Sequence, residues 1–181
     1  MSEVILQTRL DKSIDLQSMI SFIDNKVERG MYEAQTVQTE NGKQVILEER
    51  ACFLIVPDMR VELTTFLDQL ALEYAQKELD AKPEDRTLAV QHSFLCNPVG
   101  GGVPRHIDFF ADMQYPIHIV TLAYFNSDFD GGELVFPDLE KSFKPEPGLV
   151  IAFDAKIPHM VTPLKSGRRY CLQRGHTLVS A

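Results

Sequence analysis

IHIVTLAYFNSDFDGGELVFPDLEKSFKPEPGLVIAFD, residues 117–154, decides the fold class of this chain. It contains three short apolar or alternating runs, which glycine, proline, asparagine and aspartate separate. Runs of this length with turn residues between them predict β-strands rather than helices. Two further runs flank the segment, TLAVQHSFL at 87–95 and RRYCLQRGHTLV at 168–179. The chain from residue 87 onward therefore predicts an all-β core of small strands, either a barrel or a sandwich.

The first half of the chain has helical periodicity instead. Apolar residues recur at three- and four-residue steps in 13–29 and again in about 59–79, which predicts two amphipathic helices. Asp11 or Ser13 is the expected N-cap of the first helix, and Gly30 its C-terminal cap. The predicted fold class is thus mainly β with N-terminal helices (α+β), the two helices packing against the β-core.

A hairpin is predicted near residues 33–50, between the two helices. Asn41-Gly42 lies in a polar stretch with strand-like residues on both sides, which is the strongest short hairpin signal. No linker or internal repeat divides the chain, so a single domain over 1–181 is expected. In that domain, helical support and the hairpin occupy about 1–86, and the β-core occupies about 87–178.

Composition and charge exclude several classes of function. The net charge of -8 and the pI near 5.1 argue against binding to a nucleic acid backbone. No segment reaches the roughly 20 apolar residues of a membrane span, and the N-terminus lacks the features of a signal peptide, so a cytoplasmic protein is expected. Three widely spaced cysteines without a Cys-x-x-Cys pair argue against a disulfide framework and against structural zinc.

His106-Ile107-Asp108 and the later His159 indicate metal chemistry. In an extended strand, residues i and i+2 point to the same face, so His106 and Asp108 can bind one ion. Two imidazoles and one carboxylate fill one face of an iron coordination sphere and leave three positions for a co-substrate and oxygen. The alternative is a surface strand whose polar residues face water. His118 is a rival ligand, but its apolar run favours a packed position.

Arg169, ten residues after His159, is the candidate anchor for a dicarboxylate that chelates such a metal. A guanidinium can pair with a carboxylate through two parallel hydrogen bonds. The alternative is an exposed charge in a basic turn. Strand alternation predicts that Arg169, Cys171 and Gln173 share one face, opposite Arg168, Tyr170 and Leu172. Arg105 is either an exposed neighbour of the site or a contact for a substrate carboxylate at the pocket mouth.

Taken together, an ordered series of motifs carries a family resemblance. Residues about 90–178 resemble the Fe(II)/2-oxoglutarate-dependent oxygenases, and most closely the prolyl 4-hydroxylase-type branch. The motifs are RHID at 105–108, LAYFN at 122–126, GGELVFP at 131–137, PGLVIAF at 147–153, and the segment from His159 through Tyr170. A lone His-x-Asp would be a weak signal, whereas the ordered set is specific.

The resemblance implies a double-stranded β-helix, that is, a jelly-roll or cupin-like core buttressed by the two helices. It also implies that His106, Asp108 and His159 bind Fe(II), and that Arg169 binds the C5 carboxylate of 2-oxoglutarate. Because the aspartate is present, a halogenase is disfavoured: related halogenase sites have a small residue there.

One position departs from the family pattern. The family often has a tyrosine that helps bind the co-substrate about ten residues before the first histidine, and this chain has Cys96 there. Tyr124 and Thr121 are the candidates to supply that second contact.

The expected activity is hydroxylation of an unactivated aliphatic carbon of an amino acid or a peptidyl residue, with release of succinate and CO2. The substrate is then a small molecule or a peptide, and only the resemblance favours proline. O2 is the expected co-substrate and ascorbate an optional cofactor, while the hairpin near 33–50 is expected to cover the substrate.

The alternatives are desaturation or cyclisation by the same chemistry, a non-catalytic metal-dependent β-helix module for binding or sensing, and a cupin-like metal enzyme without a keto acid. Arg169 argues against the last of these.

Overall fold

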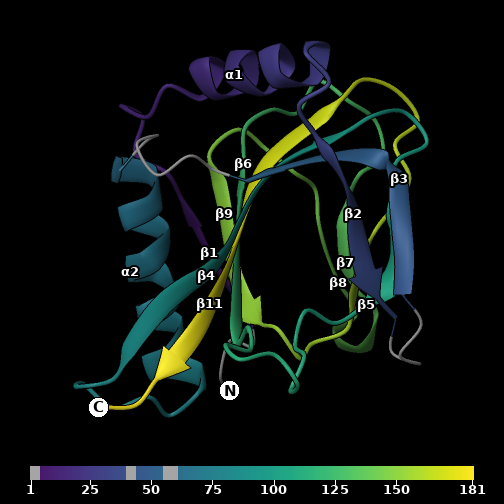
Figure 1. The fold of residues 1–181 in the computed structure, drawn as a ribbon. Helices are drawn as coiled ribbons and strands as arrows, with labels where there is room; N and C mark the ends of the chain where they lie inside the picture. Colours follow the sequence, from purple (N-terminus) through teal and green to yellow (C-terminus); the bar gives the residue numbers. More distant parts are fainter. Residues whose placement is uncertain (1–4, 40–43, 55–60) are drawn as a thin grey trace.

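The computed structural model describes residues 5–39, 44–54 and 61–181, which form two antiparallel sheets with two helices outside them (Figure 1). In spatial order, the larger sheet contains β1 (Ile5–Arg9), β9 (Leu149–Asp154), β6 (Ile119–Tyr124), β11 (Arg169–Val179), β4 (Arg86–Asn97), β3 (Gln44–Leu54) and β2 (Glu33–Gln38). The smaller sheet contains β5 (Val103–His106), β10 (His159–Val161), β7 (Leu134–Phe136) and β8 (Lys141–Phe143), and a short 3-10 helix, η1 (Pro137–Leu139), joins the last two.

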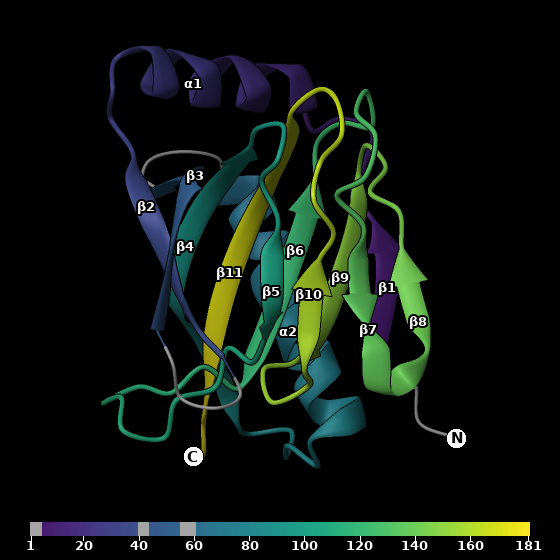
Figure 2. The same ribbon diagram turned by 90° about the vertical axis from the view of Figure 1, so that its right-hand side faces the viewer.

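The two sheets form a jelly roll, as the resemblance implies. Figure 2 shows the smaller sheet lying in front of the larger one. An inner apolar cluster fills the space between the sheets and includes Val120, Leu122 and Phe136. A second cluster covers the outer face of the larger sheet and includes residues of both helices. The central strands are apolar on both faces, which is why their sequences read as continuous apolar runs rather than alternating ones.

Both predicted helices are present. The first, α1 (Leu16–Glu28), begins one turn later than expected, because the carboxylate of Asp15 accepts a hydrogen bond from the backbone N–H of Ser18 at 3.0 Å and is the N-cap. Asp11 instead accepts from the backbone N–H of Ser13, at 2.8 Å, in the preceding turn. Gly30 has a φ of +66° just after the helix, as its predicted capping role requires.

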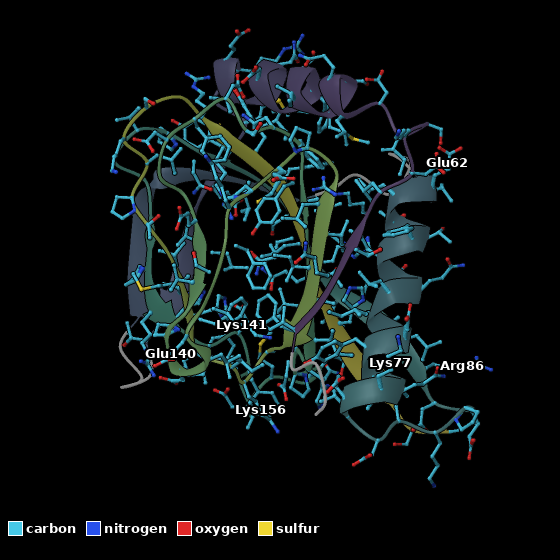
Figure 3. The ribbon with its side chains drawn as sticks, turned by 180° about the vertical axis from the view of Figure 1, so that it is seen from behind. Glu62, Lys77, Arg86, Glu140, Lys141 and Lys156 are labelled. Carbon is cyan, nitrogen blue, oxygen red and sulfur yellow. The ribbon has the colours of Figure 1, made fainter. Side chains whose placement is uncertain are left out.

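The second helix, α2 (Val61–Glu78), lies along the outer face of the larger sheet, and α1 crosses one end of the fold (Figure 1). Figure 3 labels Glu62 and Lys77 near the two ends of α2. The hydroxyl of Tyr74 accepts a hydrogen bond from the backbone N–H of Asp154 at 2.9 Å, which ties this helix to the last residue of β9. In the described part of the chain, neither helix is long and apolar enough to cross a membrane.

The predicted hairpin is confirmed. Strands β2 and β3 pair in antiparallel fashion, and β3 also pairs with β4, so the hairpin extends the larger sheet. Its expected tip, Asn41-Gly42, lies outside the described residues. Strand β1 was not expected from the sequence. It is an edge strand paired with β9, in which only Ile5 is buried while Gln7 and Arg9 are exposed, so its short length carries little apolar signal.

A polar network lies under α2, on the outer face of the larger sheet. Arg174 is buried and donates to Asp68 of α2 and to Nδ1 of His92, both at 2.6 Å. His176 is fully buried beside it, with Nε2 at 3.1 Å from the hydroxyl oxygen of Thr121. Burial, and then the charge of Arg174, lower the pKa of His176 to about 3.

This network predicts a loss of stability in acid. In the unfolded chain His176 binds a proton near pH 6.5, whereas in the folded chain it stays neutral down to about pH 3. Its contribution is therefore complete above about pH 6.5 and decreases as the pH falls, by up to about 1.4 kcal/mol per pH unit. We expect the free energy of unfolding, measured by urea denaturation, to fall more steeply between pH 6.5 and 4 in the wild type than in a His176→Gln variant. Equal slopes would contradict the assignment.

Candidate metal centre

Two short strands of the smaller sheet bring the predicted histidines together. His106 is the last residue of β5 and His159 the first of β10, and the two are direct partners in the antiparallel pair. Their rings lie side by side, with centroids 4.2 Å apart. Both residues are buried, at 3% and 4% exposure, so each imidazole must be stabilised by defined partners.

Asp108 completes the group, from a position just beyond the end of β5. Its backbone N–H donates to the carbonyl of Ala155 at 2.9 Å, and this bond to the turn after β9 holds it in place. The carboxylate lies with Oδ1 3.6 Å from Nε2 of His106 and Oδ2 3.5 Å from Nε2 of His159. The expectation that one extended strand carries both residues is wrong in detail, because the strand ends at His106. Nevertheless, one ligand atom from each of the three residues lies within 4.8 Å of the others.

Backbone carbonyls select the tautomer of each histidine. Nδ1 of His106 lies 2.8 Å from the carbonyl of Pro104, and Nδ1 of His159 lies 2.9 Å from the carbonyl of Ile157. Because a carbonyl oxygen can only accept, Nδ1 of each ring carries the proton and donates it. In the neutral ring Nε2 then keeps its lone pair, on the side where Asp108 lies. This is the usual arrangement of histidines that bind a metal through Nε2.

The walls beside the three residues are aromatic. Phe153 lies with its ring centroid 4.8 Å from that of His159, and Phe136 at 5.9 Å. Both phenylalanines are fully buried and belong to the inner cluster. An ion held here would be screened from water on this side, which strengthens its electrostatic attraction to the carboxylate.

Gln173 orients the carboxylate. It lies on the inner face of β11, is 6% exposed, and its Nε2 donates to Oδ2 of Asp108 at 3.3 Å. The sequence placed this residue on the same face as Arg169 but gave it no role. Residues that hold a ligand in this way commonly change metal affinity when they are replaced.

We expect Gln173→Leu to weaken metal binding about 10-fold, because Asp108 loses the donor that fixes its orientation. Competition between the protein and a colorimetric chelator for Mn(II) or Co(II) measures this directly. Gln173→Asn shortens the side chain but keeps an amide, and it should lie between the wild type and the leucine variant. An unchanged affinity in Gln173→Leu would show that Asp108 is held by its backbone contacts alone.

Arg169 lies on the same inner face, at the start of β11, with 1% exposure. Its Nη1 donates to Oδ1 of Asn97 at 2.7 Å, and its Nη2 lies 3.4 Å from the hydroxyl oxygen of Tyr124, whose ring centroid is 5.0 Å from the guanidinium carbon. Among the described side chains, those of residues 5–33, 37, 39 and 61–181, none forms a salt bridge with this guanidinium, and its Nε has no hydrogen-bond partner there. A buried cation of this kind requires an anion to offset its desolvation. The donor set therefore fits a carboxylate here and a divalent metal at the triad.

The two candidates for the second co-substrate contact have different outcomes. Tyr124 faces the interior beside Arg169, in the inner cluster. Thr121 is on the opposite face of β6, where its hydroxyl contacts His176 in the network under α2, so its predicted role is wrong. Cys96 also faces outward: it belongs to the outer cluster, and burial raises the pKa of its thiol to about 11. The next residue, Asn97, faces inward beside Arg169, and no sequence pattern had singled it out.

Two further residues that the sequence singled out, Arg105 and His118, have partners other than the three ligands. Arg105, in β5, forms an ion pair with Asp138 of η1 at 2.8 Å, and 39% of its side chain is exposed. His118 accepts a hydrogen bond at Nδ1 from the backbone N–H of Leu178 at 3.1 Å, which supports the packed position expected for it. Lys156, labelled toward the lower end of Figure 3, lies 4.6 Å from the ring centroid of Phe109, the residue after Asp108.

Comparisons with known proteins agree with this geometry. Residues 91–174, which include the three ligands, Asn97 and Arg169, match the model of the 2OG-Fe(II) oxygenase superfamily. A search of curated proteins gave no match.

Solved structures of prolyl hydroxylases share the fold. A prolyl-4-hydroxylase from Pseudomonas putida superposes with a TM-score of 0.70 at 20% identity, over 96% of this chain and 91% of that one. A prolyl hydroxylase from Trichoplax adhaerens, in complex with a hypoxia inducible factor oxygen degradation domain peptide fragment, gives 0.70 at 18% identity over 96% and 83%. The viral collagen prolyl hydroxylase from Paramecium Bursaria Chlorella virus-1, in its 2OG complex, gives 0.64 at 14% identity over 97% and 96%.

Proposed function

We propose that this chain, whose residues 91–174 match the 2OG-Fe(II) oxygenase superfamily, hydroxylates an aliphatic carbon of a peptidyl residue, with proline as the first candidate. It is a 2-oxoglutarate-dependent dioxygenase that uses Fe(II), 2-oxoglutarate and O2. The observation that carries the proposal is the buried triad of His106, Asp108 and His159, whose ligand atoms lie within 4.8 Å of one another.

Each group near the triad has a proposed task. The two imidazoles and the carboxylate hold Fe(II), and Arg169 binds the distal carboxylate of 2-oxoglutarate. With O2, the bound metal and co-substrate supply the oxidation of a C–H bond to an alcohol, while 2-oxoglutarate becomes succinate and CO2. Phe136 and Phe153 keep water from one side of the metal, and the backbone carbonyls of Pro104 and Ile157 keep both histidines in the binding tautomer.

A peptide substrate is favoured by exposed side chains in the segment that follows Asp108. The segment that follows Asp108 carries Met113 and Tyr115, whose exposed fractions are 48% and 50%. Phe109 and Lys156 form a cation-π contact next to it. Exposed apolar and aromatic side chains suit contact with an extended peptide better than with a small polar amino acid. The Trichoplax neighbour was solved with a peptide fragment, which supports the same choice.

The test is to incubate the purified protein with Fe(II), 2-oxoglutarate and O2 against a library of peptides that contain proline. Matched peptides with alanine in place of proline, and free amino acids, serve as controls. Proline-dependent succinate release together with a product heavier by one oxygen atom is the expected result. A product lighter by two hydrogen atoms would indicate desaturation or cyclisation instead. Absence of succinate release with every substrate, despite metal and 2-oxoglutarate binding, would favour a binding or sensing module.

A further inference from the structure

We propose that Asn97 is a co-substrate-binding residue, whose side-chain N–H donates a hydrogen bond to the same carboxylate of 2-oxoglutarate that Arg169 binds. The inference rests on the proposed function, because it takes Arg169 as the anchor of that carboxylate. It assigns a second donor to the co-substrate site at the residue after Cys96, which occupies the position where the family often has a tyrosine.

The register of the larger sheet places Asn97 beside Arg169. Asn97 is the last residue of β4 and Arg169 the first of β11, and they are direct partners in the antiparallel pair. Partners in such a pair project to the same face, and here that face is the interior. The next pair along, Cys96 and Tyr170, projects outward against the helices. Asn97, rather than Cys96, is therefore the β4 residue that shares a surface with the proposed anchor.

The hydrogen bond between the two side chains fixes the orientation of the amide. Asn97 is fully buried, and the atom 2.7 Å from Nη1 of Arg169 must be an acceptor, since a guanidinium only donates. That atom is Oδ1. The amide nitrogen, Nδ2, then has no hydrogen-bond partner within the described residues, and neither has Nε of Arg169.

Two buried, unpartnered donors on a bonded pair of side chains call for an acceptor. Folded proteins leave few such groups unpaired, since each has lost its hydrogen bonds to water without gaining another. The guanidinium brings a positive charge, so the acceptor that satisfies both groups best is an anion. A carboxylate has two oxygens and about four acceptor positions, which is enough for the amide and the guanidinium together.

Titration of the Zn(II)-loaded protein with 2-oxoglutarate tests the assignment without turnover. The comparison ligand is 2-oxopentanoate, which has the same keto acid head and chain length but no distal carboxylate. In the wild type 2-oxoglutarate should bind more tightly than 2-oxopentanoate. Asn97→Ala should weaken 2-oxoglutarate about 10- to 100-fold, as expected for one hydrogen bond to a charged group, and leave 2-oxopentanoate unchanged.

Asn97→Asp is the sharper variant, because it keeps an acceptor for Arg169 and replaces the donor with a negative charge. We expect it to raise the thermal midpoint of the metal-loaded protein, since the buried guanidinium gains a carboxylate partner, and to lose selective binding of 2-oxoglutarate. Cys96→Ser changes the adjacent residue on the opposite face of the sheet and is the matched control. Its affinity for 2-oxoglutarate should equal that of the wild type.

A direct readout separates binding from mere positioning of Arg169. In protein labelled with nitrogen-15 at asparagine, the side-chain amide signal of Asn97 is identified by its absence from Asn97→Ala. It should shift on addition of 2-oxoglutarate and not on addition of 2-oxopentanoate. A signal unmoved by saturating 2-oxoglutarate, or an Asn97→Asp variant with wild-type affinity, would overturn the inference. A wild type that binds no 2-oxoglutarate would refute the proposed function itself.

Discussion

An Asp108→Asn variant is expected to lose more than about 100-fold in affinity for Fe(II) or Mn(II) and to release no succinate. Replacing a ligand that binds the ion directly should cost more than the 10- to 100-fold typical of residues that only orient a ligand. Asparagine keeps the shape of the side chain but removes the one negative charge among the three ligands, and the charge supplies much of the attraction for a divalent cation. Fluorescence or electron paramagnetic resonance titration with Mn(II) measures the loss.

The fold should survive this change. Asp108 is 8% exposed, and without a metal its charge is costly to bury, so the amide should not lower the free energy of unfolding of the metal-free protein by more than about 1 kcal/mol. The rise in thermal midpoint that the wild type shows on adding Mn(II) should disappear. Asp112→Asn, an exposed carboxylate in the same segment, is the control and should bind Mn(II) normally. Wild-type affinity in Asp108→Asn would place the ion elsewhere.

Arg169→Leu should raise the dissociation constant of 2-oxoglutarate by about 30- to 5000-fold and leave metal affinity unchanged. Removing one partner of a buried, hydrogen-bonded charge pair costs about 2–5 kcal/mol, most of it from the charge left unpaired. Calorimetric titration of the Zn(II)-loaded protein separates the two affinities. Arg169→Lys keeps the charge but cannot form two parallel hydrogen bonds, and it should give an intermediate value.

The adjacent arginine provides a control for this variant. Arg168 faces outward, with 54% of its side chain exposed, and lies 3.5 Å from Asp24 of α1. Arg168→Leu should leave 2-oxoglutarate binding as in the wild type. If both variants lost metal and 2-oxoglutarate equally, the effect of Arg169→Leu would be a folding defect rather than the loss of an anchor.

Much of the fold could be predicted because its signals are local. Turn residues between short apolar runs marked the strands, and periodicity marked both helices, since those patterns reflect the backbone geometry of single elements. Strand β1 was not predicted because it is short and partly exposed. The N-cap of α1 was misplaced because Asp11, Ser13 and Asp15 all suit that role, and only the backbone path selects among them.

The errors at the site have one physical cause. Side chains alternate along a strand, so Thr121 and Tyr124, three residues apart on β6, must face opposite sides. Alternation alone does not say which side is the interior. On β4, Cys96 occupies the position of the missing family tyrosine and faces outward, whereas the adjacent Asn97 faces the interior, a difference that the sequence did not show.

By itself the sequence determined the chemistry: two histidines, an aspartate and an arginine in an order typical of one family, on strands that the local pattern marks. Only the tertiary structure decided which faces enclose the site. In the tertiary structure His106 pairs with His159 and Asn97 lies beside Arg169, whereas Thr121 contacts the network under α2. The reason is that the central strands are buried on both faces, by the smaller sheet on one side and by helices on the other. In such a sheet both faces are apolar, and only packing distinguishes inside from outside.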